Sequence, residues 1–148
     1  MQDRTRGWIS MALFVVLLSL SACSGQDSNA THTEHPAQVE HIDGPELRRV
    51  TLTERAVERI GLETVSIREE QLSGSLRKIV PYSSLIYDSR GRTWIYTSPQ
   101  PRTFIRLEVD VDRIEGDRVL LRKGPPAGTV VASVGVAELY GTEFEIGH

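Results

Sequence analysis

The chain has 148 residues, of which 39% are hydrophobic, enough for one folded domain with additional segments. Its 17 lysines and arginines against 20 aspartates and glutamates give a net charge of -3. Without an excess of basic residues, nucleic acid is not expected as a partner. The single cysteine excludes a framework of internal disulfides.

The first 22 residues have the composition of a secretory signal peptide. Arg4 and Arg6 precede a short apolar run at residues 8–18, and small residues follow. This run is shorter than the roughly 20 residues that a membrane-spanning helix needs. The only cysteine, Cys23, ends this stretch. The alternative to a functional role is a buried or incidental free thiol.

The sequence Leu-Ser-Ala-Cys at residues 20–23 resembles the lipobox of bacterial lipoproteins. In that family the cysteine is acylated and the signal peptide is removed just before it. The resemblance implies that Cys23 carries acyl chains such as palmitate, and two such chains give stable anchoring. The mature chain would then lie on the extracytoplasmic side of a membrane, which is the periplasmic side in a Gram-negative cell.

Residues 23–46 are polar and lack hydrophobic periodicity, so they are expected to form a flexible tether. Three histidines fall here, His32, His35 and His41, and with neighbouring glutamates they could loosely bind a divalent metal. No predicted helix holds them at a fixed spacing, which favours a solvated linker over a metal site. We therefore expect no cofactor. A metal- or small-ligand-binding lipoprotein remains the alternative function.

Catalysis is the least favoured function. The sequence has no Gly-x-Ser-x-Gly motif and no phosphate-binding loop, and no nucleophile has a base nearby in the chain. Three of the four histidines lie in the predicted tether, and the fourth, His148, is the last residue. These observations favour a binding role.

The folded domain is expected at residues 47–148 and begins with a strand. Thr53 is a candidate N-cap for a two-turn helix at residues 54–60. Gly61 is suited to end that helix in a left-handed conformation. Residues 62–68 then alternate between two faces, which predicts a strand.

A further strand at residues 72–80 leads into the strongest hairpin signal of the chain. The strands of this hairpin are residues 85–87 and 93–96, which are rich in β-branched and aromatic side chains. The turn at residues 88–91 has an aspartate to cap its own backbone and a glycine to allow a positive φ. Pro81 lacks an N–H and suits a strand start or an edge.

The rest of the chain predicts strands at residues 104–112, 118–122 and 129–134, a rigid loop at 124–128 and one helical turn within 135–140. In the first of these strands, the inward side chains are expected to be Leu107, Val109 and Val111, and the outward ones Glu108, Asp110 and Asp112. Three carboxylates on one face could bind a cation. Arg106 and Arg113 flank them, which favours a solvated, partly paired face. The fold class is therefore mainly β, roll- or barrel-like, with one short helix.

The two halves of the domain are expected to share one core. An isolated strand pair is marginal in water, so the first half needs apolar side chains from the second. The side chains that it would bury are Val57, Ile60, Val65 and Ile67. In the second half, Trp94 or its neighbour Ile95 is expected to lie in the core, since alternation places them on opposite faces.

The order of these segments resembles the membrane-proximal domain of periplasmic adaptor proteins, the membrane fusion proteins of efflux pumps. Residues 51–64 resemble its first half, and residues 80–96, 124–128 and 134–140 resemble its second half. The motif residues are Gly61, Pro81, Tyr82, Gly91, Trp94, Tyr96, Gly124, Gly128 and Gly135. The resemblance implies a partner transporter of the resistance-nodulation-division or ABC type.

The chain departs from full adaptors in the middle. In that family a barrel, a lipoyl domain and a helical hairpin separate the two halves, whereas only residues 68–75 do so here. The segments that contact an outer-membrane channel therefore have no counterpart. The resemblance then implies a protein that binds or modulates a transporter and does not bridge a full pump.

Overall fold

The computed structural model describes residues 35–42, 46–72 and 74–145. The predicted signal peptide, Cys23 and His32 lie outside these residues. The described part of the chain is mainly β, as the sequence predicted. Its strands are β1 (Ala37–His41), β2 (Arg48–Leu52), β3 (Glu63–Ser66), β4 (Arg68–Leu72), β5 (Ser75–Pro81), β6 (Ile86–Tyr87), β7 (Thr93–Gln100), β8 (Thr103–Glu115), β9 (Arg118–Lys123) and β10 (Val130–Val134). Its helices are α1 (Glu54–Ile60) and α2 (Val136–Glu145), with a 3₁₀ turn, η1 (Tyr82–Ser84).

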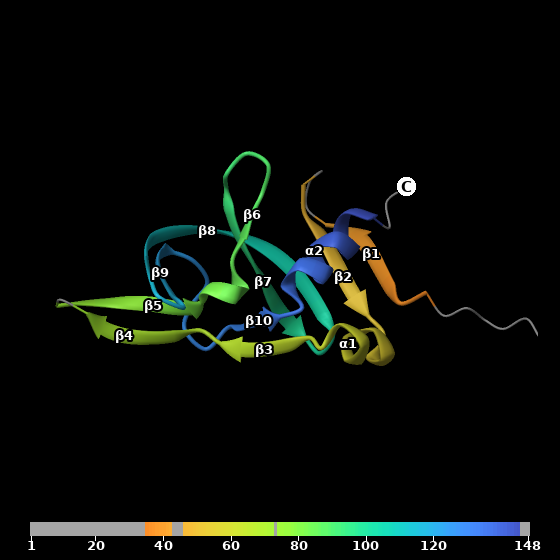
Figure 1. Cartoon of the computed structure of the whole chain (residues 1–148), viewed down its shortest axis with the longest axis horizontal. Helices are drawn as coiled ribbons and strands as arrows, with labels where there is room; N and C mark the ends of the chain where they lie inside the picture. The colour runs from red at the N-terminus through yellow and green to blue at the C-terminus, as the bar shows by residue number, and fades with distance from the viewer. Residues whose placement is uncertain (1–34, 43–45, 73, 146–148) are drawn as a thin grey trace, which may run out of the picture. The chain divides into compact units, whose positions relative to one another are not determined.

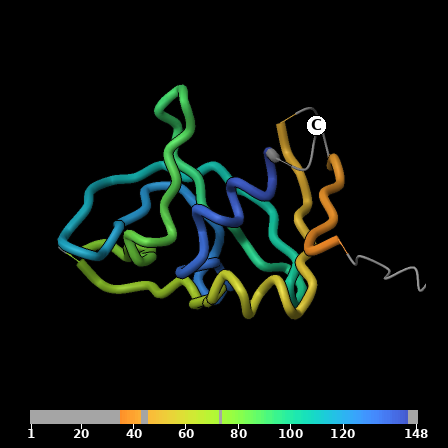
Figure 2. The backbone as a smooth tube through the Cα atoms, turned by 45° about the vertical axis from the view of Figure 1, so that its right-hand side comes forward, coloured from red at the N-terminus to blue at the C-terminus, as the bar shows by residue number. Residues whose placement is uncertain are grey.

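The strands form one curled sheet that resembles half of a barrel. Its main path runs β3-β10-β7-β8-β9-β5-β4, and neighbouring strands are antiparallel. Strand β2 joins the sheet through β8 and carries β1 on its other edge, while β6 pairs with β7. The β4–β5 hairpin and the β1–β2 pair lie at opposite ends of the sheet (Figures 1 and 2).

Helix α1 begins and ends where the local signals predicted. The Oγ1 atom of Thr53 accepts a hydrogen bond from the backbone N–H of Ala56 at 3.2 Å. Gly61 has a φ of 60° and ends the helix in the left-handed conformation. The hairpin of β6 and β7 is also confirmed, with Gly91 at a φ of 78° in its turn.

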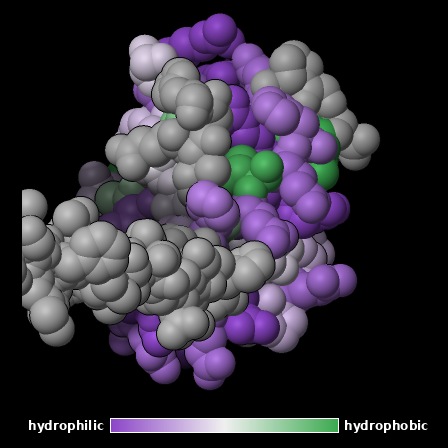
Figure 3. Space-filling view, turned by 90° about the vertical axis from the view of Figure 1, so that its right-hand side faces the viewer, coloured by the Kyte–Doolittle hydropathy of each residue, from purple (hydrophilic) through white to green (hydrophobic). Residues whose placement is uncertain are grey.

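Strand β1 was not expected, because residues 23–46 were predicted to be a flexible tether. That prediction is wrong for Ala37–His41, which pair with β2 along its whole length. Ala37 is buried, Val39 is half-buried, and the side chains between and after them are exposed. The alternation is too short to stand out in a polar sequence, and the strand exists because it satisfies the free edge of β2. Viewed from the right-hand side of Figure 1, where β1 lies, the described surface is mostly hydrophilic (Figure 3).

Residues 68–75, the segment that separates the two halves, belong to the β4–β5 hairpin, so the strand predicted at 72–80 begins at Ser75 and a strand not predicted covers residues 68–72. Arg68 lies opposite Ile79 and Leu72 lies opposite Ser75, with Gly74 at a φ of 81° next to the turn. The charged sequence of β4 has no apolar alternation that would predict a strand. The strand forms because its backbone pairs with β5. Pro81 is the last residue of β5, not the first residue of a strand.

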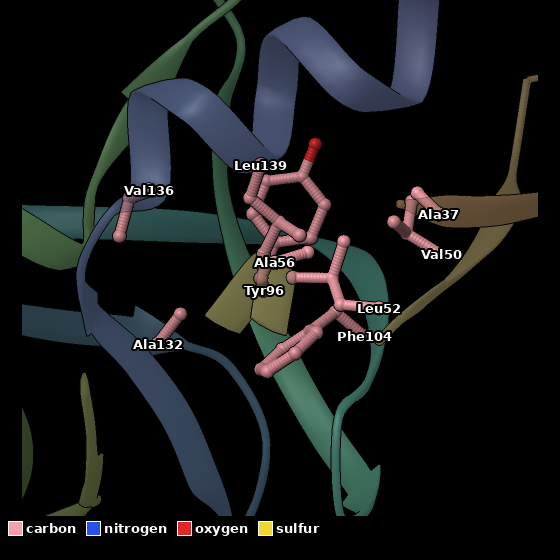
Figure 4. Packing of buried hydrophobic residues seen from close by; sticks show 9 residues of the cluster. All are labelled: Ala37, Val50, Leu52, Ala56, Tyr96, Phe104, Ala132, Val136 and Leu139. Carbon is pink, nitrogen blue, oxygen red and sulfur yellow. The ribbon is translucent and has the colours of Figure 1, made fainter. Parts of the chain in front are cut away.

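Two hydrophobic clusters lie along the sheet, and residues from both halves of the chain contribute to each. The first contains Ala37, Val50, Leu52, Ala56, Tyr96, Phe104, Ala132, Val136 and Leu139 (Figure 4). The second contains Ile67, Val80, Ile95, Val109, Val119, Leu121 and Val131. Both Trp94 and Ile95 are buried, so β7 is covered on both faces. The expected packing of the two halves against each other is therefore present, divided between two clusters.

Strand β8 contributes to both clusters. Phe104 points into the first cluster, and Val109, on the opposite face, belongs to the second. Leu107 was predicted to face inward and is 39% exposed, which corrects that prediction. It shares a face with Val109 and lies opposite Ile95, but it is not part of the second cluster.

Helix α2 spans ten residues, where the sequence predicted a single turn. Its Gly141 and Thr142 have low helix propensity, which hid the second half of the helix. Burial of Val136, Leu139 and Glu143 against the sheet compensates for that weakness. Neither α1 nor α2, the helices of the described chain, has the length and apolar character needed to cross a membrane.

Candidate anion-binding recess

A recess with a volume of about 210 Å³ lies where β2, the β6–β7 turn, β8 and α2 meet. We call it the arginine recess, because four of its lining residues are arginines. Its lining residues are Glu46, Arg48, Asp88, Ser89, Arg90, Arg92, Arg106, Tyr140 and Phe144. They come from segments that are far apart in the sequence, and only the fold brings them together.

Arg106 lines the recess and is only 4% exposed. Its Nε atom lies 3.3 Å from Oε1 of Glu143, and its Nη2 donates to the backbone carbonyl of Glu46 at 2.9 Å. Its guanidinium also lies over three aromatic rings, with 4.2 Å to the centroid of Trp94 and 5.2 Å to that of Phe144; the third ring, Tyr140, is at 6.0 Å. These contacts fix the position of the buried charge.

Glu143 is completely buried and connects the recess to the first cluster. The Tyr96 hydroxyl donates to its Oε2, and in Figure 4 that hydroxyl points towards α2. Arg48 Nη1 donates to the backbone carbonyl of Glu143 at 2.6 Å. Burial first, and then the negative charge of Glu143, raise the pKa of Tyr96 far above its ordinary value, so its hydroxyl stays protonated and donates.

The β6–β7 turn forms one wall of the recess and depends on Asp88. Its Oδ1 accepts the backbone N–H groups of Arg90 and Arg92, each at 2.9 Å. Its Oδ2 accepts from Arg92 Nε at 2.7 Å and from the indole N–H of Trp94 at 3.1 Å. Burial alone would raise the pKa of Asp88, but these hydrogen bonds outweigh it and lower the pKa to about 2.

Glu46 bridges two arginines at the mouth of the recess. Its Oε1 lies 3.2 Å from Arg90 Nη1, and its Oε2 lies 3.1 Å from Arg92 Nη1. The hydrogen bond from Arg92, followed by the charge of that residue, lowers the pKa of Glu46. The carboxylate is therefore ionised at neutral pH and marks a position where two guanidiniums share one oxyanion.

The recess has more positively than negatively charged side chains around it. Its four arginines face three carboxylates, those of Glu46, Asp88 and the buried Glu143. Among the described residues, Arg48 forms no ion pair and bonds instead to a backbone carbonyl. Guanidinium groups bind carboxylate and phosphate oxygens through paired, charge-assisted hydrogen bonds. The recess therefore has the chemistry of an anion-binding site.

Three of the motif residues belong to this site. The Trp94 ring contacts Arg106, the Tyr96 hydroxyl bonds to Glu143, and Gly91 provides the positive φ of the β6–β7 turn. The others lie elsewhere and have structural roles. Gly61 and Gly128 adopt positive φ, Pro81 ends β5, and Tyr82 is half exposed in η1. Gly124 and Gly135 are in crowded positions, where an added Cβ would lie 2.9 Å from Leu121 and 3.2 Å from Leu62, respectively.

Of the three histidines predicted as weak metal ligands, His32 lies outside the described residues. His35 and His41 are both exposed, and His41 ends β1 opposite Arg48. In the part of the chain that the structure describes, no three His, Cys, Asp or Glu residues form a group that could hold a metal. The carboxylates of β8 are partly paired, as expected, but Arg106, one of the two arginines expected beside them, is buried and paired with Glu143 instead. Asp112 lies 3.1 Å from Arg122 and 3.2 Å from Arg113.

The sequence reasoning missed the residues that define the recess, Arg48, Arg92, Arg106 and Glu143. The signal that could have revealed Arg106 is the register of its strand, which only the structure gives. Arg106 is placed directly opposite Tyr96 between β8 and β7, on the face that also carries buried Phe104. An arginine on the apolar face of a strand indicates a buried charge with a dedicated partner. That partner, Glu143, lies 37 residues further along, in a helix that was predicted too short.

Replacing Asp88 with asparagine is expected to change how stability depends on pH. The pKa of Asp88 is lowered from 3.8 to about 2, so its contribution is complete above pH 4 and lost as the pH falls towards 2. The difference in thermal unfolding midpoint between wild type and Asp88→Asn should therefore be constant from pH 5 to 7 and shrink below about pH 4. Asp117→Asn, in the β8–β9 turn, is the control. A difference that grows on acidification would contradict the assignment.

Comparisons of the chain with protein families, with characterised proteins and with solved structures found no match.

Proposed function

We propose that the chain is a lipid-anchored extracytoplasmic protein whose domain binds a transporter and modulates it, acting by binding and not by catalysis. The partner would be an efflux transporter of the resistance-nodulation-division or ABC type. Two sequence features support this proposal. They are the lipobox-like sequence ending at Cys23 and the order of segments that resembles the membrane-proximal domain of efflux adaptors.

The observation that carries the proposal is the direct packing of the two halves. Val50 and Leu52 from the first half lie in one cluster with Tyr96 and Phe104 from the second. Between the halves, the chain forms only the β4–β5 hairpin. Such packing is what a membrane-proximal domain without the inserted domains of a full adaptor would need, and it supports a role in binding a transporter over one in reaching an outer-membrane channel.

Co-purification from native membranes tests this function. The tagged full chain is cross-linked in cells, solubilised in mild detergent and captured, and we expect a transporter to be enriched with it. The Cys23→Ser variant is the matched control. It should no longer incorporate labelled palmitate, and it should lose most of the captured transporter because anchoring keeps the domain near its partner. Palmitate labelling that persists in Cys23→Ser would refute the anchor. An acylated wild type that captures no transporter would refute the partner.

A further inference from the structure

We propose that the arginine recess binds a phosphate group, carried either by a small soluble phosphate ester or by a lipid headgroup. The two sources share the same chemistry, a compact tetrahedral oxyanion held by guanidinium groups. The lipid source rests on the proposed membrane anchoring, whereas the soluble ester does not. Neither source depends on the identity of a transporter.

The first argument is the arrangement of Arg106. A buried ion pair contributes little net stability, and apolar residues of similar volume often replace one without loss. Yet this guanidinium is held by Glu143, by the Glu46 carbonyl and by three aromatic rings while it still lines the recess. A charge fixed so firmly in the lining of a recess is preorganised for an anion, since binding requires little further ordering of the side chain.

The second argument is the convergence of the other arginines. Arg48 comes from β2, and Arg90 and Arg92 come from the β6–β7 turn, so their guanidiniums approach the recess from different directions. Glu46 already places one carboxylate between Arg90 and Arg92 at 3.2 and 3.1 Å. That bridge demonstrates the spacing at which two guanidiniums share an oxyanion. Arg48 adds a charge that no carboxylate among the described side chains neutralises.

Phosphate fits the recess better than a carboxylate does. A ligand must compete with Glu46 for Arg90 and Arg92, and the attraction of a dianion for these charges is about twice that of a monoanion at equal distance. The three terminal oxygens of a phosphate ester can also accept from several directions, whereas a carboxylate has two oxygens in one plane. The volume of about 210 Å³ is below the roughly 300–1,000 Å³ of sites for drug-sized ligands, which suits a phosphate group with a small substituent.

Trp94 provides the readout for a binding experiment. Its ring lies 4.9 Å from the Arg92 guanidinium and 4.2 Å from that of Arg106, so an anion that engages these arginines should change its fluorescence. The full chain, purified from membranes in a neutral detergent, is titrated with glycerol 1-phosphate, dihexanoyl phosphatidate, dihexanoyl phosphatidylcholine and succinate. We expect a saturable response to the two phosphate monoesters that weakens with added salt. Trp94→Phe should remove the response.

Three charge variants test the location of binding. Arg48→Ala should weaken the binding of the phosphate monoesters about tenfold or more, because it removes charge-assisted hydrogen bonds. Arg122→Ala removes the same charge from an exposed arginine of β9 and should leave affinity within about twofold, since screening suppresses distant surface charges. Glu46→Gln removes the competing carboxylate and should tighten binding. A merely structural role of Glu46 does not predict that gain.

The outcomes separate clearly. Equal affinity for glycerol 1-phosphate and dihexanoyl phosphatidate supports the proposal with a soluble ester as the source, and phosphatidate binding at least tenfold tighter supports it with a lipid headgroup as the source. The proposal is overturned if neither monoester binds saturably, if succinate binds as tightly, or if Arg48→Ala and Arg122→Ala lose affinity equally. Should Arg48→Ala fail to fold, weaker binding by folded Glu46→Gln also overturns it. Failure of transporter capture would leave these results unaffected.

Discussion

The free energy of unfolding of the Glu143→Ala variant is expected to be about 3–5 kcal/mol lower than that of the wild type. This is the usual loss when one partner of a buried ion pair is removed. Its carboxylate is completely buried and lies 3.3 Å from Arg106 Nε. Truncation leaves that guanidinium without its counter-charge and the Tyr96 hydroxyl without its acceptor. Urea unfolding followed by circular dichroism measures the loss.

Two comparisons make this result specific. Glu138→Ala removes an exposed glutamate from the same helix and should change stability by less than about 0.5 kcal/mol. The double variant Glu143→Leu with Arg106→Met should lose less stability than the losses of Glu143→Leu and Arg106→Met added together, because it removes both charges at once. Strict additivity would show that Arg106 and Glu143 do not depend on each other.

The Phe104→Ala variant is expected to destabilise the domain by about 3–5 kcal/mol, because it leaves a cavity that the first cluster cannot refill. Phe104 is 1% exposed and packs with residues of both halves. Leu107→Ala, on the same strand, is the matched control. Its side chain is 39% exposed, so we expect a loss below about 1 kcal/mol. Similar losses in the two variants, measured by urea unfolding, would contradict the burial pattern of β8.

Local signals predicted much of the fold. Thr53 and Gly61 fixed the limits of α1, and Asp88 with Gly91 located the β6–β7 turn, because capping and turn chemistry act within a few residues. Strand β1 escaped prediction because its stability comes from pairing with β2 and not from its own composition. Propensity does not record whether a partner strand has a free edge.

The candidate site was harder to predict, for a related reason. Trp94 and Tyr96 were singled out as motif residues, but the charges that surround them come from β2, the β6–β7 turn, β8 and α2. Glu143 reaches the recess only because α2 continues past Gly141, which tertiary packing decides. In a sequence with 25% charged residues, nothing distinguishes a buried arginine such as Arg106 from a solvated one until its strand register is known.

The position of strand β8 bears on how the domain opens. This strand of 13 residues pairs with β2, β7 and β9, and its side chains enter both hydrophobic clusters. Neither cluster can therefore come apart while the other keeps its full set of contacts, so partial opening around β8 should be rare. Hydrogen exchange at its central amides should then proceed only through unfolding of the whole domain. The exchange rate there would report global stability, whereas the amides of the edge strand β1 would exchange through local fraying.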